Sequence, residues 1–216
     1  MLCVARTDDE SRFKESWINV CLERGAGRTL THALEYIPAG YRTFTGVDLG
    51  VRVKRGSDVT SIFTIIVHPN EDREILDIQA GRWVGPEIVR RIVDTHHRYQ
   101  SIVTVENNAA QEFIVQFTKD SSAVPVRPFF TTSQKLRDPE FGLESMAVEI
   151  ENQKWIIPSR GGRAAHPEIA KWINEMLYYD PNGHPGDRLM SSWFAREGSR
   201  HKRIVGRNRR LDTISR

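Results

Sequence analysis

The sequence predicts an α/β protein with a mixed sheet of five or more strands, in the order β-β-β-α-β-α-β-α, flanked by helices. Two observations predict this class. Three strand-like segments follow one another through short loops, which is typical of an antiparallel meander. Later strand-like segments alternate with helical ones, and a strand reached through a helical crossover lies parallel to its neighbour.

Length and composition set the broad class. The chain has 216 residues, of which 39% are hydrophobic and 27% charged, so it can bury a core without disulfides. No apolar run approaches the roughly 20 residues of a membrane span, and the N-terminus lacks the apolar stretch of a secretory signal. Cys3 and Cys21 are expected to be free thiols in a reducing compartment. These features predict a cytoplasmic protein without a membrane partner.

Residues 1–40 are interpreted as a lead-in helix and linker. Apolar residues recur at helical spacing from Phe13 to Leu22, and Gly25 to Gly27 breaks that helix. The main domain is expected at 41–197. A basic tail at 198–216 is expected to be flexible.

The first three strands are predicted from apolar and β-branched patterns. The segment 41–49 ends in an apolar run, and 59–67 (VTSIFTIIV) is rich in β-branched residues. In the segment 73–81, alternate positions carry two different sets of side chains, which is typical of a strand whose two faces differ in solvent exposure.

The second half alternates helices and strands. Helices are predicted at 86–99, 109–117, 139–149, 168–178 and 187–196, from apolar residues at helical spacing. Short strands are predicted at 101–106, 124–130 and 154–157. Pro125 and Pro128 favour an edge position for the strand at 124–130, because proline cannot donate to a strand ladder.

The net charge of +3 is unevenly distributed. Residues 196–216 hold eight basic and two acidic residues, whereas residues 1–195 have a net charge of −3. A basic tail that includes Lys202 and Arg203, on a slightly acidic body, indicates a polyanionic partner such as nucleic acid. A solubilising terminus is the alternative interpretation.

Three acids occupy comparable places along the chain. Asp48 ends the first predicted strand, Glu106 ends the fourth, and Asp187 opens the last helix. If the first and fourth strands are parallel neighbours, Asp48 and Glu106 project from the carboxyl edge, where open α/β sheets bind ligands. Clustered carboxylates repel one another unless cations lie between them, and oxygen ligands suit Mg²⁺ or Mn²⁺. Taken singly, each acid could instead cap a turn or a helix.

The residues around these acids resemble a known family. The segments TGVDLG at 45–50, GSDVT at 56–60, VENNAAQ at 105–111 and HPGDRLM at 184–190 resemble the nuclease domain of the large terminase subunit of tailed bacteriophages. The resemblance covers about residues 41–197. It depends on the order and spacing of the segments more than on any single motif.

The resemblance implies a ribonuclease H-like fold and a specific activity. Asp48, Glu106 and Asp187 would ligate two Mg²⁺ or Mn²⁺ ions that cut double-stranded DNA, with little sequence specificity, during viral genome packaging. The implied partners are a packaging ATPase domain, the portal and the small terminase subunit, in the cytoplasm of an infected bacterial host.

Two departures from the family pattern stand out. The family often has two adjacent aspartates in its last motif, whereas Gly186 precedes Asp187 here. The chain also lacks the G-x-x-x-x-G-K-[ST] phosphate loop of the packaging ATPase. The sequence is therefore expected to be an isolated nuclease domain, either a part of a longer protein or a separately encoded one.

Further residues are candidates for supporting roles. Asp58 is a candidate accessory metal ligand, or a solvated loop acid. His184 is a candidate contact to a metal-bound water or a phosphate, or a turn histidine. Five basic residues near the acids are candidate phosphate contacts, or ordinary solvated charges: Arg52, Lys54, Arg55, Lys135 and Arg137.

Other functions remain open at this point. A Holliday-junction resolvase or transposase-type nuclease uses similar acid clusters on a similar fold. A non-catalytic DNA-binding module of a packaging motor, in which the acids only cap turns, is the alternative from another class. Stabilisation by Mn²⁺ would separate that module from a metal-dependent enzyme.

Overall fold

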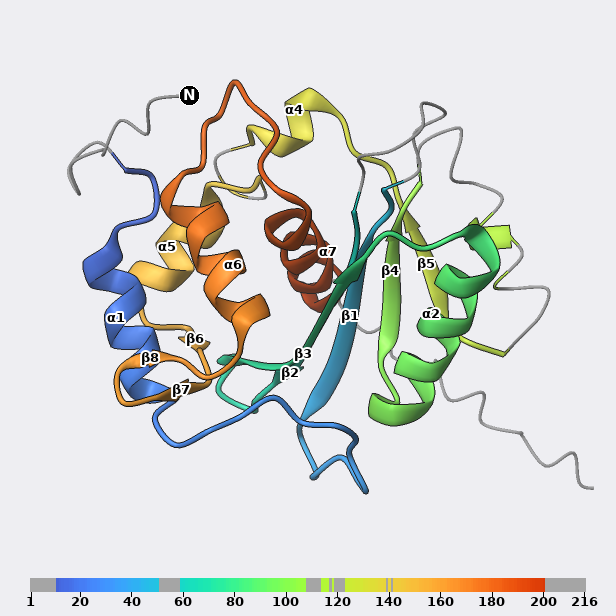
Figure 1. The fold of residues 1–216 in the computed structure, drawn as a ribbon, viewed down its shortest axis with the longest axis horizontal. Coiled ribbons are helices and arrows are strands. Elements are labelled where there is room, and N and C mark those ends of the chain that lie inside the picture. The colour runs from blue at the N-terminus through green and yellow to red at the C-terminus, as the bar shows by residue number, and fades with distance from the viewer. Residues whose placement is uncertain are drawn as a thin grey trace, which may run out of the picture.

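The computed structural model describes residues 11–50, 59–107, 114–116, 118, 123–138, 140 and 142–200. A mixed six-stranded sheet forms its centre, in the order β5-β4-β1-β2-β3-β6 (Figure 1). The strands are β1 (Arg42–Asp48), β2 (Thr60–Val67), β3 (Arg73–Gly81), β4 (Ile102–Glu106), β5 (Val126–Phe129) and β6 (Trp155–Ile156). The predicted mixed sheet of five or more strands is confirmed.

The strand directions follow the predicted pattern. β1, β2 and β3 form an antiparallel meander, and β4 lies parallel to β1. β5 lies parallel to β4 at one edge of the sheet, and β6 lies parallel to β3 at the other. The edge position of β5 is the one predicted from Pro125 and Pro128. The carboxyl ends of β1, β4 and β5 therefore meet at the same edge.

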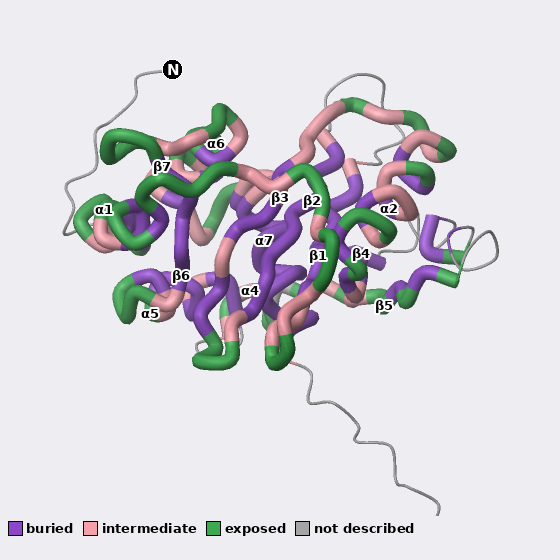
Figure 2. The backbone as a smooth tube through the Cα atoms, turned by 90° about the horizontal axis from the view of Figure 1, so that it is seen from below, coloured by how far each residue is buried: buried purple, intermediate pink, exposed green. Residues whose placement is uncertain are grey.

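The helices cover both faces of the sheet. Six have described bounds: α1 (Glu15–Arg24), α2 (Gly85–Tyr99), α4 (Ser133–Leu136), α5 (Ser145–Glu151), α6 (Pro167–Leu177) and α7 (Asp187–Arg200). Residues 114–116 are also helical. α2 packs its apolar stripe against one face, over β1 and β4, whereas α1, α5, α6 and α7 contribute to the core on the other (Figure 1). The sheet's central strands are buried from both sides (Figure 2).

α7 packs so closely against β1 that a side chain at position 46 would clash with the helix backbone. A β-carbon at Gly46 of β1 would lie 2.0 Å from the carbonyl oxygen of Ser191 and 2.3 Å from the amide nitrogen of Ala195. A small-residue stripe permits this approach on the helix side: Ser191, Ser192, Ala195, Gly198 and Ser199 are all buried. The N-terminus of α7 is thereby fixed beside the carboxyl end of β1.

The lead-in helix α1 is part of the main core. Phe13, Ile18 and Cys21 are almost fully buried and belong to the same apolar cluster as residues of α5, α6 and α7. The amide of Ile157 donates to the carbonyl oxygen of Cys21, and Ser159 N donates to Gly25 O. A small hairpin of β7 (Ser159–Arg160) and β8 (Arg163–Ala164) continues from β6.

Two predicted helices differ in extent from those observed. The helix predicted at 139–149 begins only at Ser145, because residues 142–144 form turns, and the short helix α4 precedes it. The last helix continues beyond residue 196 to Arg200, because its buried small residues keep it against the sheet. Most of the helix predicted at 109–117 lies outside the described residues.

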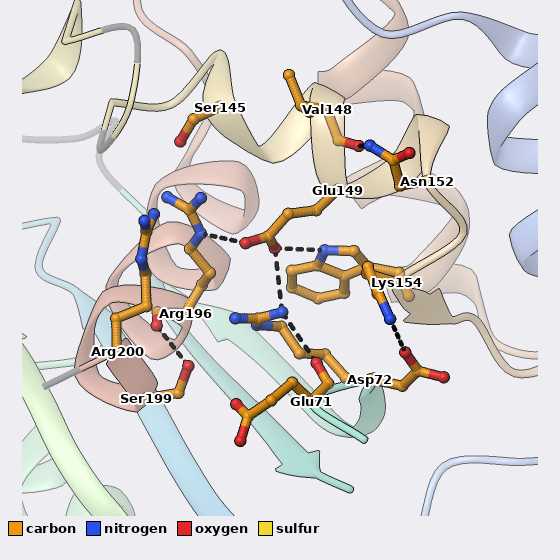
Figure 3. A network of polar contacts seen from close by, with 12 residues as sticks. Glu71, Asp72, Ser145, Val148, Glu149, Asn152, Lys154, Arg196, Ser199 and Arg200 are labelled. Atoms are coloured by element: carbon orange, nitrogen blue, oxygen red, sulfur yellow. Dashed lines mark hydrogen bonds and ion pairs between the residues drawn. The ribbon is translucent and has the colours of Figure 1, made fainter. Parts of the chain in front are cut away.

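Buried charges join α5 and α7 to the sheet (Figure 3). Glu149 Oε1 accepts a hydrogen bond from Arg196 Nε at 2.9 Å, and Glu149 Oε2 lies 3.3 Å from Arg73 Nη1. Trp155 Nε1 donates to the same Oε2 atom at 3.2 Å, and Arg196 Nη1 donates to Glu197 at 2.7 Å. Arg196 is only 2% exposed, so its charge is held by these partners.

Among the described residues, no helix is both long enough and apolar enough to cross a membrane.

Candidate active site

Two acidic side chains meet at the ends of neighbouring parallel strands. Val47 pairs with Val105 across β1 and β4, which places Asp48 beside Glu106 at the next position. Both are buried, and their carboxyl groups share a hydrogen bond. The predicted parallel pairing of these strands therefore brings Asp48 and Glu106 together.

The environment of Asp48 disfavours its negative charge. Burial raises the pKa of its carboxyl group well above the usual range, and the nearby charges of Glu106, Asp187 and Glu175 raise it further. A hydrogen bond between two carboxyl groups requires a proton, which the pair of Asp48 and Glu106 shares. A cation would favour the ionised form of the same group.

Asp187 and His184 also lie close to Asp48. Asp187 is the first residue of α7, and His184 lies in the turn that precedes this helix. One ligand atom from each of Asp48, Asp187 and His184 lies within 4.8 Å of the others. Asp48 of β1 therefore has Glu106 of β4 and Asp187 of α7 as close acidic neighbours.

The ring of His184 is oriented by the turn. Its Nδ1 atom accepts a hydrogen bond from the amide of Gly186 at 3.1 Å. This bond occupies the lone pair of Nδ1, so the neutral ring carries its hydrogen on Nε2. In this arrangement the exposed His184 is suited to donate to an anion or a bound water.

A further carboxylate, Glu175 of α6, borders this group. Its Oε1 atom accepts from Arg188 Nη1 at 2.9 Å, and its Oε2 atom accepts from the amide of Leu189 at 2.8 Å. Burial raises the pKa of Glu175, with Asp187 adding to the effect, although both hydrogen bonds oppose it. Sequence reasoning missed Glu175, because its partners lie in the following helix and no local spacing marks it.

Asn107 adds a polar atom at the same edge of the sheet. It directly follows Glu106 and is 7% exposed. Within the described part of the chain, its Oδ1 atom has no hydrogen-bond partner. An amide oxygen left without a donor is the kind of ligand that hard divalent cations accept.

The donor set fits a hard divalent cation. The ligand atoms that gather at Asp48 come from the carboxylates of Asp48 and Asp187 and the ring of His184, with no thiolate among them, and the Glu106 carboxyl group adjoins Asp48. Buried carboxylates that repel one another gain stability when a cation lies between them. These residues therefore fit Mg²⁺ or Mn²⁺.

The predicted basic residues fall into two groups. Lys135 and Arg137 are exposed and lie near the end of β5, which pairs with β4 at Glu106. Lys135 Nζ donates to the carbonyl oxygen of Phe130 at 3.0 Å and lies 5.3 Å from the centre of the Phe129 ring. Six other predicted site residues lie outside the described residues: Arg52, Lys54, Arg55, Asp58, Lys202 and Arg203.

A cavity of about 440 Å³ opens beside β5. Aromatic side chains and both signs of charge line it, including Phe129, Phe130, Trp193, Lys135, Asp138 and Glu197. The two acids make this cavity a poor phosphate site, although it adjoins the strand that pairs with β4.

Comparisons with known proteins place the fold. No family model matches the sequence, and no curated protein matches it. The structure is similar to the crystal structure of the large terminase nuclease from thermophilic phage G20c, with a TM-score of 0.52 and 14% identity over 82% of this chain and 95% of that chain. T. thermophilus RuvC, in complex with a Holliday junction substrate, gives a TM-score of 0.37 and 14% identity over 73% of this chain and 97% of its own.

The chain therefore has a mixed α/β fold of the ribonuclease H-like class, with acids gathered at the carboxyl edge of its parallel strands. Within that class, its fold is that of a terminase nuclease-like domain, so the resemblance predicted from the sequence is confirmed at the level of the fold.

Proposed function

We propose that this protein is a metal-dependent endonuclease that cuts double-stranded DNA during viral genome packaging. The convergence of Asp48, Glu106 and Asp187 at one sheet edge carries the proposal. The fold shared with a phage terminase nuclease supports it. The raised pKa of Asp48 supports it as well, because a buried carboxyl cluster costs stability that a bound cation would offset.

Each of these residues has a defined part in the proposed reaction. Asp48, Glu106 and Asp187 would hold two divalent ions, with Asp58 as an accessory ligand. Two such ions would supply the activation of a water molecule and the stabilisation of the departing 3′ oxygen of the phosphodiester. His184, whose Nε2 carries a hydrogen, donates to a phosphate oxygen and so orients the scissile group.

Basic residues outside the acid cluster are proposed to bind the DNA backbone. Lys135 lies in α4, the short helix that follows β5, and Arg137 directly follows this helix. The segment that contains Arg52, Lys54 and Arg55, together with the basic segment that contains Lys202 and Arg203, is proposed to add to this set. Contacts to phosphates carry no base information, so cleavage is expected to show little sequence preference.

The proposed biological role follows from the same comparison. The packaging ATPase, the portal and the small terminase subunit are the proposed partners in an infected bacterial cell. A resolvase would use the same type of centre on branched DNA. Cleavage of a four-way junction compared with a linear duplex of equal length distinguishes the two substrates.

Cleavage of supercoiled plasmid in Mg²⁺ or Mn²⁺ tests the activity directly. Asp48→Asn is expected to abolish cleavage, whereas Glu151→Gln, an exposed acid on α5, is expected to leave it unchanged. Circular dichroism confirms that both variants are folded. Normal cleavage by Asp48→Asn would show that the acid cluster is not the catalytic centre.

A further inference from the structure

The helix that carries Asp187 begins without a capping side chain of its own. The carbonyl oxygen of Gly186 accepts the first helical hydrogen bond, from the amide of Met190 at 3.0 Å, so Gly186 is the N-cap residue of α7. Ser, Thr, Asp or Asn usually occupies this position, because its side chain accepts from an amide of the first turn. Glycine has no atom that can do this.

Glu175 of the preceding helix supplies the missing acceptor. Its Oε2 atom accepts from the amide of Leu189, the third residue of α7, at 2.8 Å. A β-carbon at position 186 would lie 2.6 Å from the Glu175 carboxylate, and Gly186 adopts a φ of +104°. The absence of a side chain at position 186 is therefore what allows Glu175 to reach the end of the helix.

Arg188 holds the same carboxylate from the other side. A positive side chain in the first turn of a helix opposes the helix dipole. Arg188 is compensated by two acids of α6, since its Nη1 donates to Glu175 at 2.9 Å and its Nε donates to Glu168 at 2.6 Å. The first turn of α7 is thus attached to α6 through both its backbone and a side chain.

We propose that Glu175 is a positioning residue for Asp187: its carboxylate caps α7 from the neighbouring helix and so fixes the direction in which Asp187 meets Asp48. This inference rests on the proposed function, because it assigns Asp187 to the metal centre. Glu175 acts through the backbone of α7 and does not itself ligate the metal. Both of its oxygens are already engaged, one by Arg188 and one by the amide of Leu189.

The affinity for Mn²⁺, measured by isothermal titration calorimetry on the full chain, tests this role. Glu175→Gln retains an oxygen that can accept from Leu189, and it is expected to keep the Mn²⁺ affinity within about threefold. Glu175→Ala removes the cap and is expected to lower the affinity by roughly 10- to 100-fold, as for other residues that orient metal ligands. Asn174→Ala, at an exposed neighbouring position on α6, is the matched control.

Two outcomes of that titration would overturn the proposal. An equal loss in Glu175→Gln and Glu175→Ala would show that the charge is needed, as for a direct ligand. An unchanged affinity in Glu175→Ala would leave Glu175 with a purely structural role. If Glu175→Ala does not fold, Glu175→Asp addresses the same contact, because its shorter side chain withdraws the carboxylate from the Leu189 amide while it keeps the charge, and it is expected to weaken Mn²⁺ binding.

Hydrogen exchange without metal separates this inference from the proposed function. The Leu189 amide is expected to lose protection in Glu175→Ala and to keep it in Glu175→Gln. Unchanged protection in Glu175→Ala would overturn the capping role, whatever the metal titration shows. If the wild-type protein binds no Mn²⁺ but the Leu189 amide still loses protection in the Glu175→Ala variant, the metal centre is refuted and the capping role of Glu175 remains supported.

Discussion

The carboxyl groups of Asp48 and Glu106 meet in a hydrogen bond at the ends of the parallel strands β1 and β4. Both side chains are buried, so neither charge is well solvated. A protein without a cation at this edge holds the pair together by retaining a proton on it. Metal binding and proton release are therefore expected to be linked.

Asp48→Asn is expected to raise the melting temperature of the protein in EDTA at pH 8 by several degrees. The pKa of Asp48 is higher in the folded than in the unfolded state, so its contribution to stability is complete below the unfolded pKa of about 4 and is lost as the pH rises through the folded pKa. The asparagine amide does not ionise, so the variant avoids this loss of stability. In a chain of this size, a change of about 1 kcal/mol in the free energy of unfolding corresponds to a change of roughly 2–4 °C in the melting temperature.

Melting temperatures at pH 5 and pH 8 provide the control. The decrease in melting temperature from pH 5 to pH 8 is expected to be larger for the wild type than for Asp48→Asn. The other titrating groups are common to both proteins, so the difference reports on Asp48. Added Mn²⁺ is expected to raise the melting temperature of the wild type alone. A lower melting temperature for Asp48→Asn than for the wild type in EDTA at pH 8 would contradict the proposed destabilisation by the ionised Asp48 carboxylate.

Gly46→Ala is expected to destabilise the fold strongly. Its methyl group would lie 2.0 Å from the carbonyl oxygen of Ser191, which is backbone and cannot rotate away. Overpacking in a core costs about 1–3 kcal/mol, and displacing a whole helix is expected to reach the upper end. Urea unfolding measures the loss. Gly183→Ala, whose β-carbon has its nearest neighbour at 3.5 Å, is expected to be almost neutral.

Glu149→Ala is expected to cost about 3–5 kcal/mol of unfolding free energy. The substitution leaves the guanidinium groups of Arg73 and Arg196 buried without their shared carboxylate (Figure 3). Denaturant unfolding compares this variant with Glu151→Gln, an exposed position on the same helix. Equal stability of the two variants would show that the network contributes little.

Truncation after Arg200 is expected to weaken DNA binding and to reduce its salt dependence. The deletion removes six basic residues and one acid. Each phosphate contact contributes about −0.9 to the slope of log affinity against log salt concentration, so the slope should become shallower. Fluorescence anisotropy at several salt concentrations measures it, and an unchanged slope would assign the tail a solubilising role. Mn²⁺ binding should not change.

Cys21 is expected to resist thiol reagents in the native protein. Burial raises the pKa of its thiol to about 11, so the reactive thiolate is scarce at pH 8. In a Cys3→Ser variant, DTNB should label Cys21 only when urea is added. Rapid labelling without urea would indicate that α1 opens readily from the core.

Local patterns determined most of the architecture. The β-branched run at 59–67 specifies β2, and the prolines at 125 and 128 specify an edge for β5, because side-chain branching and a missing amide act within a few residues. The positions of Asp48 and Glu106 at the ends of two strands predicted as parallel neighbours were enough to predict that they share a sheet edge, whereas the place of Asp187 beside them was implied only by the family resemblance.

Only the tertiary structure decided what surrounds those acids. Glu175 reaches α7 because position 186 lacks a β-carbon, and α7 reaches β1 because position 46 lacks one. Neither glycine is distinguishable in sequence from one in an ordinary turn or strand, since the atoms it accommodates lie on distant segments. Local spacing therefore predicts which acids meet, whereas close contacts between helices and sheet determine how each acid is held.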